Sequence, residues 1–311
     1  MTYEELLTEI ARANEQVVVM TAENRALVRN LPLILGKRFI DTGITEQTLV
    51  GAAAGLALRG RIPVVHALAS FLTMRAFEFV RTDAGIPNLP IKLSGFIPGF
   101  LSDANGPTHQ AIEDVALMRG IRNMTVFAPA DEDDLVKMLP HIWQSPSPAY
   151  TRINTRKTDY IHVDFEPGKA EVISEGEDIT ILTYGLLFEQ ALIATEILRA
   201  EGLAVGLVNM RSLKPVDEQA ILKASKSNLL VTLEDHFLTG GLYTIVAEVL
   251  LKNQQTANVL PIALNERWFR PALLPAVLAY EGFTGKQIAE KILGYQTQHK
   301  QPTILSSQFA E

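Results

Sequence analysis

Residues 38–65 read RFIDTGITEQTLVGAAAGLALRGRIPVV. The opening RFID is strand-like, and the glycine- and alanine-rich run from Gly51 to Gly60 is typical of a tightly packed helix. Its small side chains let another backbone approach closely. IPVV then begins a second apolar, β-branched strand. A strand, a helix and a strand in this order predict a parallel α/β sheet.

The same alternation continues on both sides of this stretch. In the first half, helices are predicted at 3–15, 71–85, 111–121 and 131–143, and strands at 17–22, 62–70, 91–96 and 125–131. In the second half, strands are predicted at 178–185, 204–210 and 228–235, and helices at 188–202 and 217–226. We therefore predict an α/β fold of two consecutive domains with mostly parallel sheets, residues 1–165 and 166–311.

The composition narrows the function classes. The chain has 311 residues, of which 47% are hydrophobic, and its formal charge of −7 argues against a nucleic-acid partner. It has no cysteine, and its six histidines form no zinc-binding pattern. The N-terminus lacks the positive charge of a signal peptide, and no apolar run is long enough for a membrane helix. We expect a soluble cytoplasmic protein.

One turn places a carboxyl group between apolar elements. Glu46 follows the strand-like RFID and the Gly43 turn, and the helix after it is nearly uncharged. A poorly solvated carboxyl group holds or shares a proton more readily near neutrality, as a general acid or base must. From spacing alone, a first-turn glutamate that interacts with the helix dipole is the simpler interpretation.

Two further segments contain candidate functional side chains. SFLTMRAFEF places Phe71 and Phe77 at helical spacing, which usually indicates core packing. NGPTHQ places His109 in a loop ahead of a helix, where a histidine is often only a surface residue or a helix cap. An ordinary histidine titrates near neutrality, which suits proton transfer. Likewise EDHFLTGGL suggests either an anion-binding helix start or a tight turn.

In this order, the segments closely resemble the pyrimidine-binding half of the transketolase family, and residues 166–311 resemble its C-terminal domain. The resemblance implies thiamine diphosphate as cofactor. It implies that Glu46 hydrogen-bonds the aminopyrimidine ring and promotes its imino form, and that Phe71 or Phe77 stacks on that ring. Glu23 falls where the family has an acidic residue near the same pocket. His109 would contact the oxygens of a donor sugar and assist proton transfer.

The resemblance also implies residues that bind the substrate. Arg119 and Arg152, with Arg156 as a substitute for Arg152, correspond to arginines that bind the substrate phosphate in the related deoxyxylulose phosphate synthases. A solvated surface arginine is the simpler interpretation of each. Asn105 stands where transketolases typically have an aspartate that contacts a sugar hydroxyl. SGFIPGFL replaces a polar loop, and we expect its Ile97, Pro98 and Phe100 to form an apolar lip at the substrate entrance.

The sequence contains no GDG motif, which in complete transketolases helps to hold the cofactor diphosphate and its metal ion. The resemblance therefore implies the smaller, C-terminal subunit of a split transketolase, a transferase of two-carbon ketol units between sugars or sugar phosphates. Mg²⁺ or Ca²⁺ would be held mainly by a large partner subunit, in an α2β2 assembly. The alternatives are a specialised transketolase for an unusual sugar, a 2-oxo acid dehydrogenase β-type subunit, and a non-catalytic interaction subunit.

Overall fold

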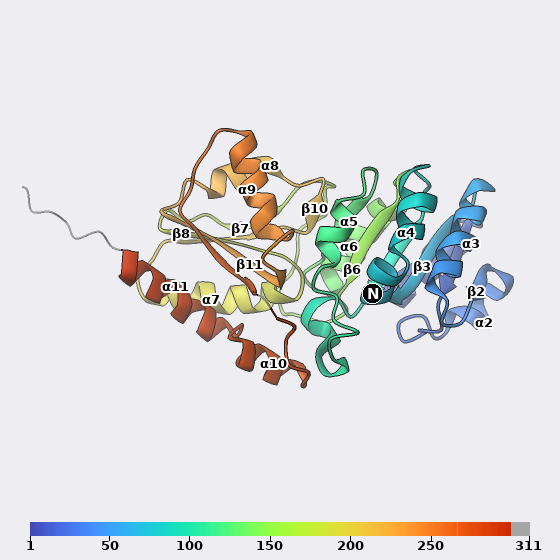
Figure 1. Ribbon diagram of the computed structural model, residues 1–311, viewed down its shortest axis with the longest axis horizontal. Coiled ribbons are helices and arrows are strands. Elements are labelled where there is room, and N and C mark those ends of the chain that lie inside the picture. The colour runs from blue at the N-terminus through green and yellow to red at the C-terminus, as the bar shows by residue number, and fades with distance from the viewer. Residues whose placement is uncertain (266, 300–311) are drawn as a thin grey trace, which may run out of the picture.

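The computed structural model describes residues 1–265 and 267–299, and it has two α/β units lying side by side along the long axis of the molecule (Figure 1). The strands of the first half are β1 (Val17–Thr21), β2 (Phe39–Asp41), β3 (Ile62–Leu68), β4 (Lys92–Phe96), β5 (Thr125–Phe127) and β6 (Ala149–Ile153). Its helices are α1 (Tyr3–Ala13), α2 (Leu31–Leu35), α3 (Glu46–Leu58), α4 (Phe77–Phe79), α5 (Asp114–Arg119) and α6 (Glu132–Gln144). Short 3-10 or π turns are η1 (Gly36–Arg38), η2 (Phe71–Arg75), η3 (Val80–Gly85) and η4 (Gly99–Asn105).

The second half has the same kind of architecture. Its strands are β7 (Glu171–Ser174), β8 (Ile179–Thr183), β9 (Val205–Asn209), β10 (Ser212–Lys214), β11 (Leu229–Phe237) and β12 (Val259–Leu264). Its helices are α7 (Phe188–Ala200), α8 (Glu218–Ala224), α9 (Leu242–Lys252), α10 (Leu274–Glu281) and α11 (Gly285–His299), with the 3-10 turn η5 (Gly185–Leu187). In Figure 1, α7 and α11 cover one face of the second sheet, and α8 and α9 cover the other.

The two sheets are mostly parallel, as predicted. The first has the strand order β10-β5-β6-β4-β3-β1-β2, and the second β12-β11-β8-β9-β7. Among the strand pairs of the described residues, two are antiparallel, β10 with β5 and β7 with β9. Because β10 comes from the second half yet joins the first sheet, the two halves share backbone hydrogen bonds. A domain boundary near residue 165 remains a proposal.

Local sequence explains several helix starts. Thr2 and Glu5 form a capping box at α1, because each side chain accepts a hydrogen bond from the other residue's backbone N–H. Asp131 caps α6 by accepting a hydrogen bond from the backbone N–H of Asp134 at 2.9 Å, as the acidic run there predicted.

Among the described residues, no helix combines the length and the apolar character that crossing a membrane requires.

A buried polar cluster ties the connection between the halves to both of them. His162 Nδ1 lies 2.7 Å from an oxygen of Glu171 on β7, and its Nε2 lies 3.4 Å from an oxygen of Asp131. Asp134, beside them, accepts a hydrogen bond from Arg211 at 2.7 Å. Burial alone would lower the pKa of His162, but the close carboxyl groups of Asp131 and Glu171 outweigh it and raise the pKa to about 9. We therefore expect His162 to be protonated in the folded protein.

This cluster predicts a pH-dependent stability. The folded protein binds a proton at His162 that the unfolded chain, with an ordinary histidine pKa of about 6.5, releases earlier. The stabilisation is complete below that value and is lost as the pH rises through about 9. We expect His162→Gln to cost about 1–3 kcal/mol near pH 6 and much less near pH 10. Chemical denaturation at both pH values measures this difference.

The exposed His141 supplies the matched control, since His141→Gln changes no buried ion pair. A deficit of His162→Gln that stays constant across the pH range would contradict the proposed imidazolium.

Candidate functional site

Most of the predicted site residues follow strands of the first sheet. Neighbouring strands β2, β1, β3, β4 and β6 are all parallel, so the segments that follow them emerge at one edge. Glu46 follows β2, Phe71 follows β3 and His109 lies in the connection after β4. In open α/β sheets, this carboxyl edge is where ligands bind.

Glu46 is the first residue of α3 and is 2% exposed. Its Oε2 accepts a hydrogen bond from Nη1 of Arg75 at 2.9 Å. Within the part of the chain that the structure describes, its other oxygen, Oε1, has no hydrogen-bond partner. The site therefore contains a nearly buried carboxylate with one oxygen paired and one available as an acceptor.

Phe71 joins this carboxylate to the predicted histidine. The Cζ of Arg75 lies 4.0 Å from the centroid of the Phe71 ring. On the same ring, His109 packs edge-to-face, with ring centroids 5.0 Å apart and planes at 63°. Glu46, Arg75, Phe71 and His109 thus form one contiguous group, which we call the carboxylate–aromatic cluster.

His109 lies at the outer side of this cluster. It is partly exposed, and its Nδ1 lies 2.9 Å from the hydroxyl oxygen of Thr108. Asn105 is exposed in the same connection, and its Nδ2 donates to the carbonyl of Ser102 at 3.0 Å. A half-exposed imidazole that packs on the same ring as Arg75 suits proton transfer to a substrate that enters from solvent.

Two predicted cofactor residues have no interaction with the cluster among the described residues. Phe77 is partly buried and packs against the main hydrophobic core. Glu23 is exposed in a left-handed turn (φ 70°), and its backbone N–H donates to Oδ1 of Asp41 at 3.0 Å. The structure thus brings Phe71 into the cluster, and it leaves Phe77 and Glu23 outside it.

The two arginines predicted to bind substrate also lie outside the cluster. Arg119 forms an ion pair with Glu248 of α9 in the second half. Arg152 is buried, with Nε 2.9 Å from Asp114 and Nη1 2.7 Å from Asp235. Burial alone would lower the pKa of Arg152, but these two carboxylates raise it well above its ordinary value. Arg156 is exposed and has no side-chain partner among the described residues.

The prediction of an apolar lip at the substrate entrance is wrong for two of its three residues. Phe100 is fully buried, packing edge-to-face on Phe269 and Phe283 with centroid distances of 5.1 and 4.9 Å. Pro98 is buried as well, and only Ile97 is partly exposed. A phenyl ring gains more by leaving water for the core between the two units than it would at an entrance.

The turn in EDHFLTGGL is not an open anion site. Glu234 accepts hydrogen bonds from the backbone N–H groups of Leu242 at 2.6 Å and Tyr243 at 2.9 Å, at the start of α9. A Cβ on Gly241 would lie 1.9 Å from this carboxylate, so the close approach requires glycine. Burial raises the pKa of Glu234 to about 7. The protein's own carboxyl group fills the helix start.

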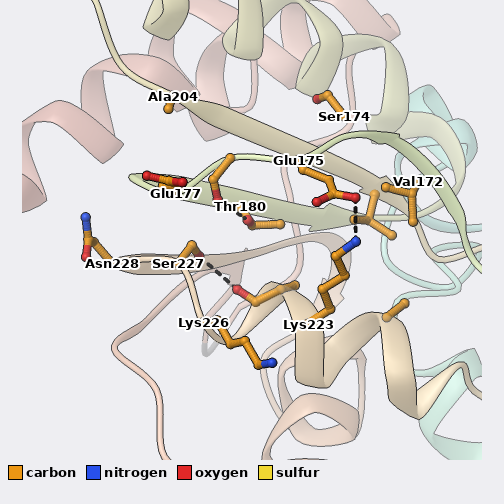
Figure 2. Close-up of a pocket in the computed structure, with 14 residues that line it drawn as sticks. Val172, Ser174, Glu175, Glu177, Thr180, Ala204, Lys223, Lys226, Ser227 and Asn228 are labelled. Carbon is orange, nitrogen blue, oxygen red and sulfur yellow. Dashed lines mark hydrogen bonds and ion pairs between the residues drawn. The ribbon is translucent and has the colours of Figure 1, made fainter.

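A hollow of about 690 Å³ lies in the second half, away from the carboxylate–aromatic cluster. Figure 2 shows it between the turn at Glu175–Glu177 and the end of α8, with Lys223 reaching across to Glu175. None of the predicted site residues lines it.

The sequence pattern did not single out the contacts of Arg75 with Glu46 and Phe71, although Arg75 lies within SFLTMRAFEF. The available signal was its position four residues after Phe71, a spacing that brings side chains together on a helical turn.

Comparison with known proteins covers nearly the whole chain. The model of the transketolase pyrimidine-binding domain matches residues 1–160, and that of the transketolase C-terminal domain matches residues 168–288. A putative transketolase C-terminal section from Methanocaldococcus jannaschii is 35% identical over 298 residues, covering 94% of each chain. The 6-deoxy-6-sulfo-D-fructose transketolase subunit SqwH of Clostridium sp. (strain MSTE9) is 36% identical over 258 residues, covering 81% of this chain and 80% of that protein.

A solved structure has the same architecture. A split gene transketolase, described as an inactive β4 tetramer, is 33% identical and superimposes with a TM-score of 0.82. The match covers 95% of this chain and 96% of that one.

Proposed function

The chain belongs to the transketolase family, and from that premise we propose that it is the C-terminal subunit of a split, thiamine-diphosphate-dependent transketolase. Its partner subunit would supply the diphosphate-binding domain and hold Mg²⁺ or Ca²⁺. The reaction would transfer a two-carbon ketol unit from a ketose donor to an aldehyde acceptor. The observation that carries this proposal is the carboxylate–aromatic cluster.

The cluster fits the aminopyrimidine part of the cofactor. Oε1 of Glu46 is an acceptor without a partner among the described residues, and it can receive a ring N–H. Phe71 is partly buried and offers an aromatic surface for stacking. When bound, thiamine diphosphate supplies a thiazolium that stabilises negative charge on the reacting carbon. Glu46 then holds a proton at the pyrimidine, and His109 moves a proton at a donor-sugar oxygen.

The surroundings of the cluster support a partner surface. Ile44 is 66% exposed and Met74 is 37% exposed, and they lie next in sequence to the turn before Glu46 and to Arg75. A contiguous exposed apolar patch marks an interface, and we propose that these two side chains belong to one. The solved relative named above is described as inactive as a β4 tetramer, which supports a requirement for a second kind of subunit. We propose an α2β2 assembly.

The substrate is proposed to be a ketose with an anionic end, a phosphate or a sulfonate. SqwH is named for a sulfonated fructose, which supports the specialised variant of this function. Arg119 and Arg152 are both paired with carboxylates, so the exposed Arg156 is the arginine we propose for the anionic end. Asn105 would contact a sugar hydroxyl in place of an aspartate.

Co-purification of the tagged chain from its host, followed by titration with thiamine diphosphate and Mg²⁺, tests the proposal. We expect a stoichiometric partner that contains GDG, and saturable cofactor binding by the complex but only weak binding by the chain alone. A chain that stays alone, or a complex indifferent to the cofactor, would instead favour the non-catalytic interaction subunit.

A further inference from the structure

Arg75 contacts both groups on which the proposed cofactor site depends. Its Nη1 donates to Oε2 of Glu46 at 2.9 Å, and its Cζ lies 4.0 Å from the Phe71 ring centroid. Phe71 and Arg75 are the first and last residues of η2, a π-helical turn, and such turns are frequent at functional sites. One side chain therefore links the carboxylate to the aromatic ring.

A guanidinium is suited to this double contact. It is planar, so it can stack on an aromatic ring while its N–H groups donate in its own plane to a carboxylate. Arg75 is 40% exposed, whereas Glu46 is 2% exposed, so the charge reaches the carboxylate from the solvent side. A lysine would keep the charge but could not stack in this way.

The contacts also determine which atoms of the site remain available. Arg75 uses Oε2 of Glu46, and among residues 1–265 and 267–299 Oε1 keeps no partner. His109 approaches the same Phe71 ring by its edge at 5.0 Å. Any rotation of Phe71 would thus change the place of the imidazole as well.

We propose that Arg75 is a positioning residue, which fixes the Glu46 carboxylate and the Phe71 ring relative to each other for binding the aminopyrimidine. This inference rests on the proposed function, but part of its test does not. Arg75 touches no reacting atom, so it acts through Glu46 and Phe71.

The first test uses the chain alone and needs no cofactor. Ring-current shifts make the His109 imidazole signal in an NMR spectrum report the orientation of Phe71, and His109→Gln assigns that signal. In Arg75→Met, we expect the chemical shift of the His109 signal to move part of the way towards its value in Phe71→Leu. Arg75→Lys should change this chemical shift by a similar amount. Arg81→Met is the matched control, because Arg81 is exposed in the same segment and its side chain has no partner among the described residues. An unmoved signal in Arg75→Met would overturn the positioning role, whatever the function.

The second test uses the complex with its co-purified partner. We expect Arg75→Met to bind thiamine diphosphate about tenfold more weakly and Arg75→Lys to fall between it and the parent. At saturating cofactor, the KM for substrate should stay constant. Unchanged cofactor affinity in Arg75→Met would overturn the inference, while cofactor binding by the parent complex would leave the proposed function standing.

Discussion

The Glu46→Gln variant of the complex is expected to lose about 10²–10⁴-fold in turnover, the usual contribution of a positioned acid–base group. Glutamine fills nearly the same volume and still offers an oxygen to Arg75, so the fold should persist. It has no carboxylate to hold a proton at the proposed pyrimidine site. Steady-state turnover with a panel of phosphorylated and sulfonated ketose donors, at saturating thiamine diphosphate, measures the loss.

Glu78→Gln provides the control, because Glu78 is exposed in α4, a few residues from Arg75. It should leave both turnover and the unfolding midpoint within experimental error. If Glu46→Gln turned over donor as fast as the parent complex, the acid–base role would be refuted, and the non-catalytic interaction subunit would become the better interpretation.

Much of the fold was predictable from the sequence, because buried parallel strands have short apolar, β-branched runs. The strands β1, β3, β4, β8, β9 and β11 all lie where such runs predicted them. The predicted helix 71–85 is instead two π-helical turns flanking a short α-helix. The strand β10 was missed, since its three residues pair with β5, some 85 residues earlier, and no local pattern encodes that pairing.

The candidate site was predictable where it depends on local sequence. Glu46, Phe71 and His109 each follow a strand of one parallel sheet, so topology alone brings them to a common edge. The ion pairs could not be predicted in this way. Arg152 meets Asp235, which is 83 residues further on, and Arg119 meets Glu248, which is 129 residues further on. Partners so distant depend on how the two units pack together.

The packing of the two units leads to the largest expected effect on stability. Arg152 is 2% exposed and lies between Asp114 of the first half and Asp235 of the second, at 2.9 and 2.7 Å. Asp114 is also bound by the hydroxyl of Tyr150 at 2.6 Å, and Asp235 by the backbone N–H of Phe100 at 3.2 Å. One guanidinium thus pairs with two buried carboxyl groups across the junction, and its single positive charge can balance one negative charge.

We expect Arg152→Met to lower the free energy of unfolding by about 3–5 kcal/mol, because it removes the one cation that pairs with both buried carboxyl groups. Arg59→Met, at an exposed arginine, should change it by no more than about 0.5 kcal/mol. Adding Asp235→Asn to Arg152→Met should restore part of the loss, since one uncompensated charge is then removed. Urea denaturation of the three variants measures these differences. If Arg152→Met had normal stability but bound substrate more weakly, the structural role of Arg152 would be refuted. Arg152 would then bind the substrate anion, as the resemblance to the synthases implied. Asp114 and Asp235 would need another counter-charge.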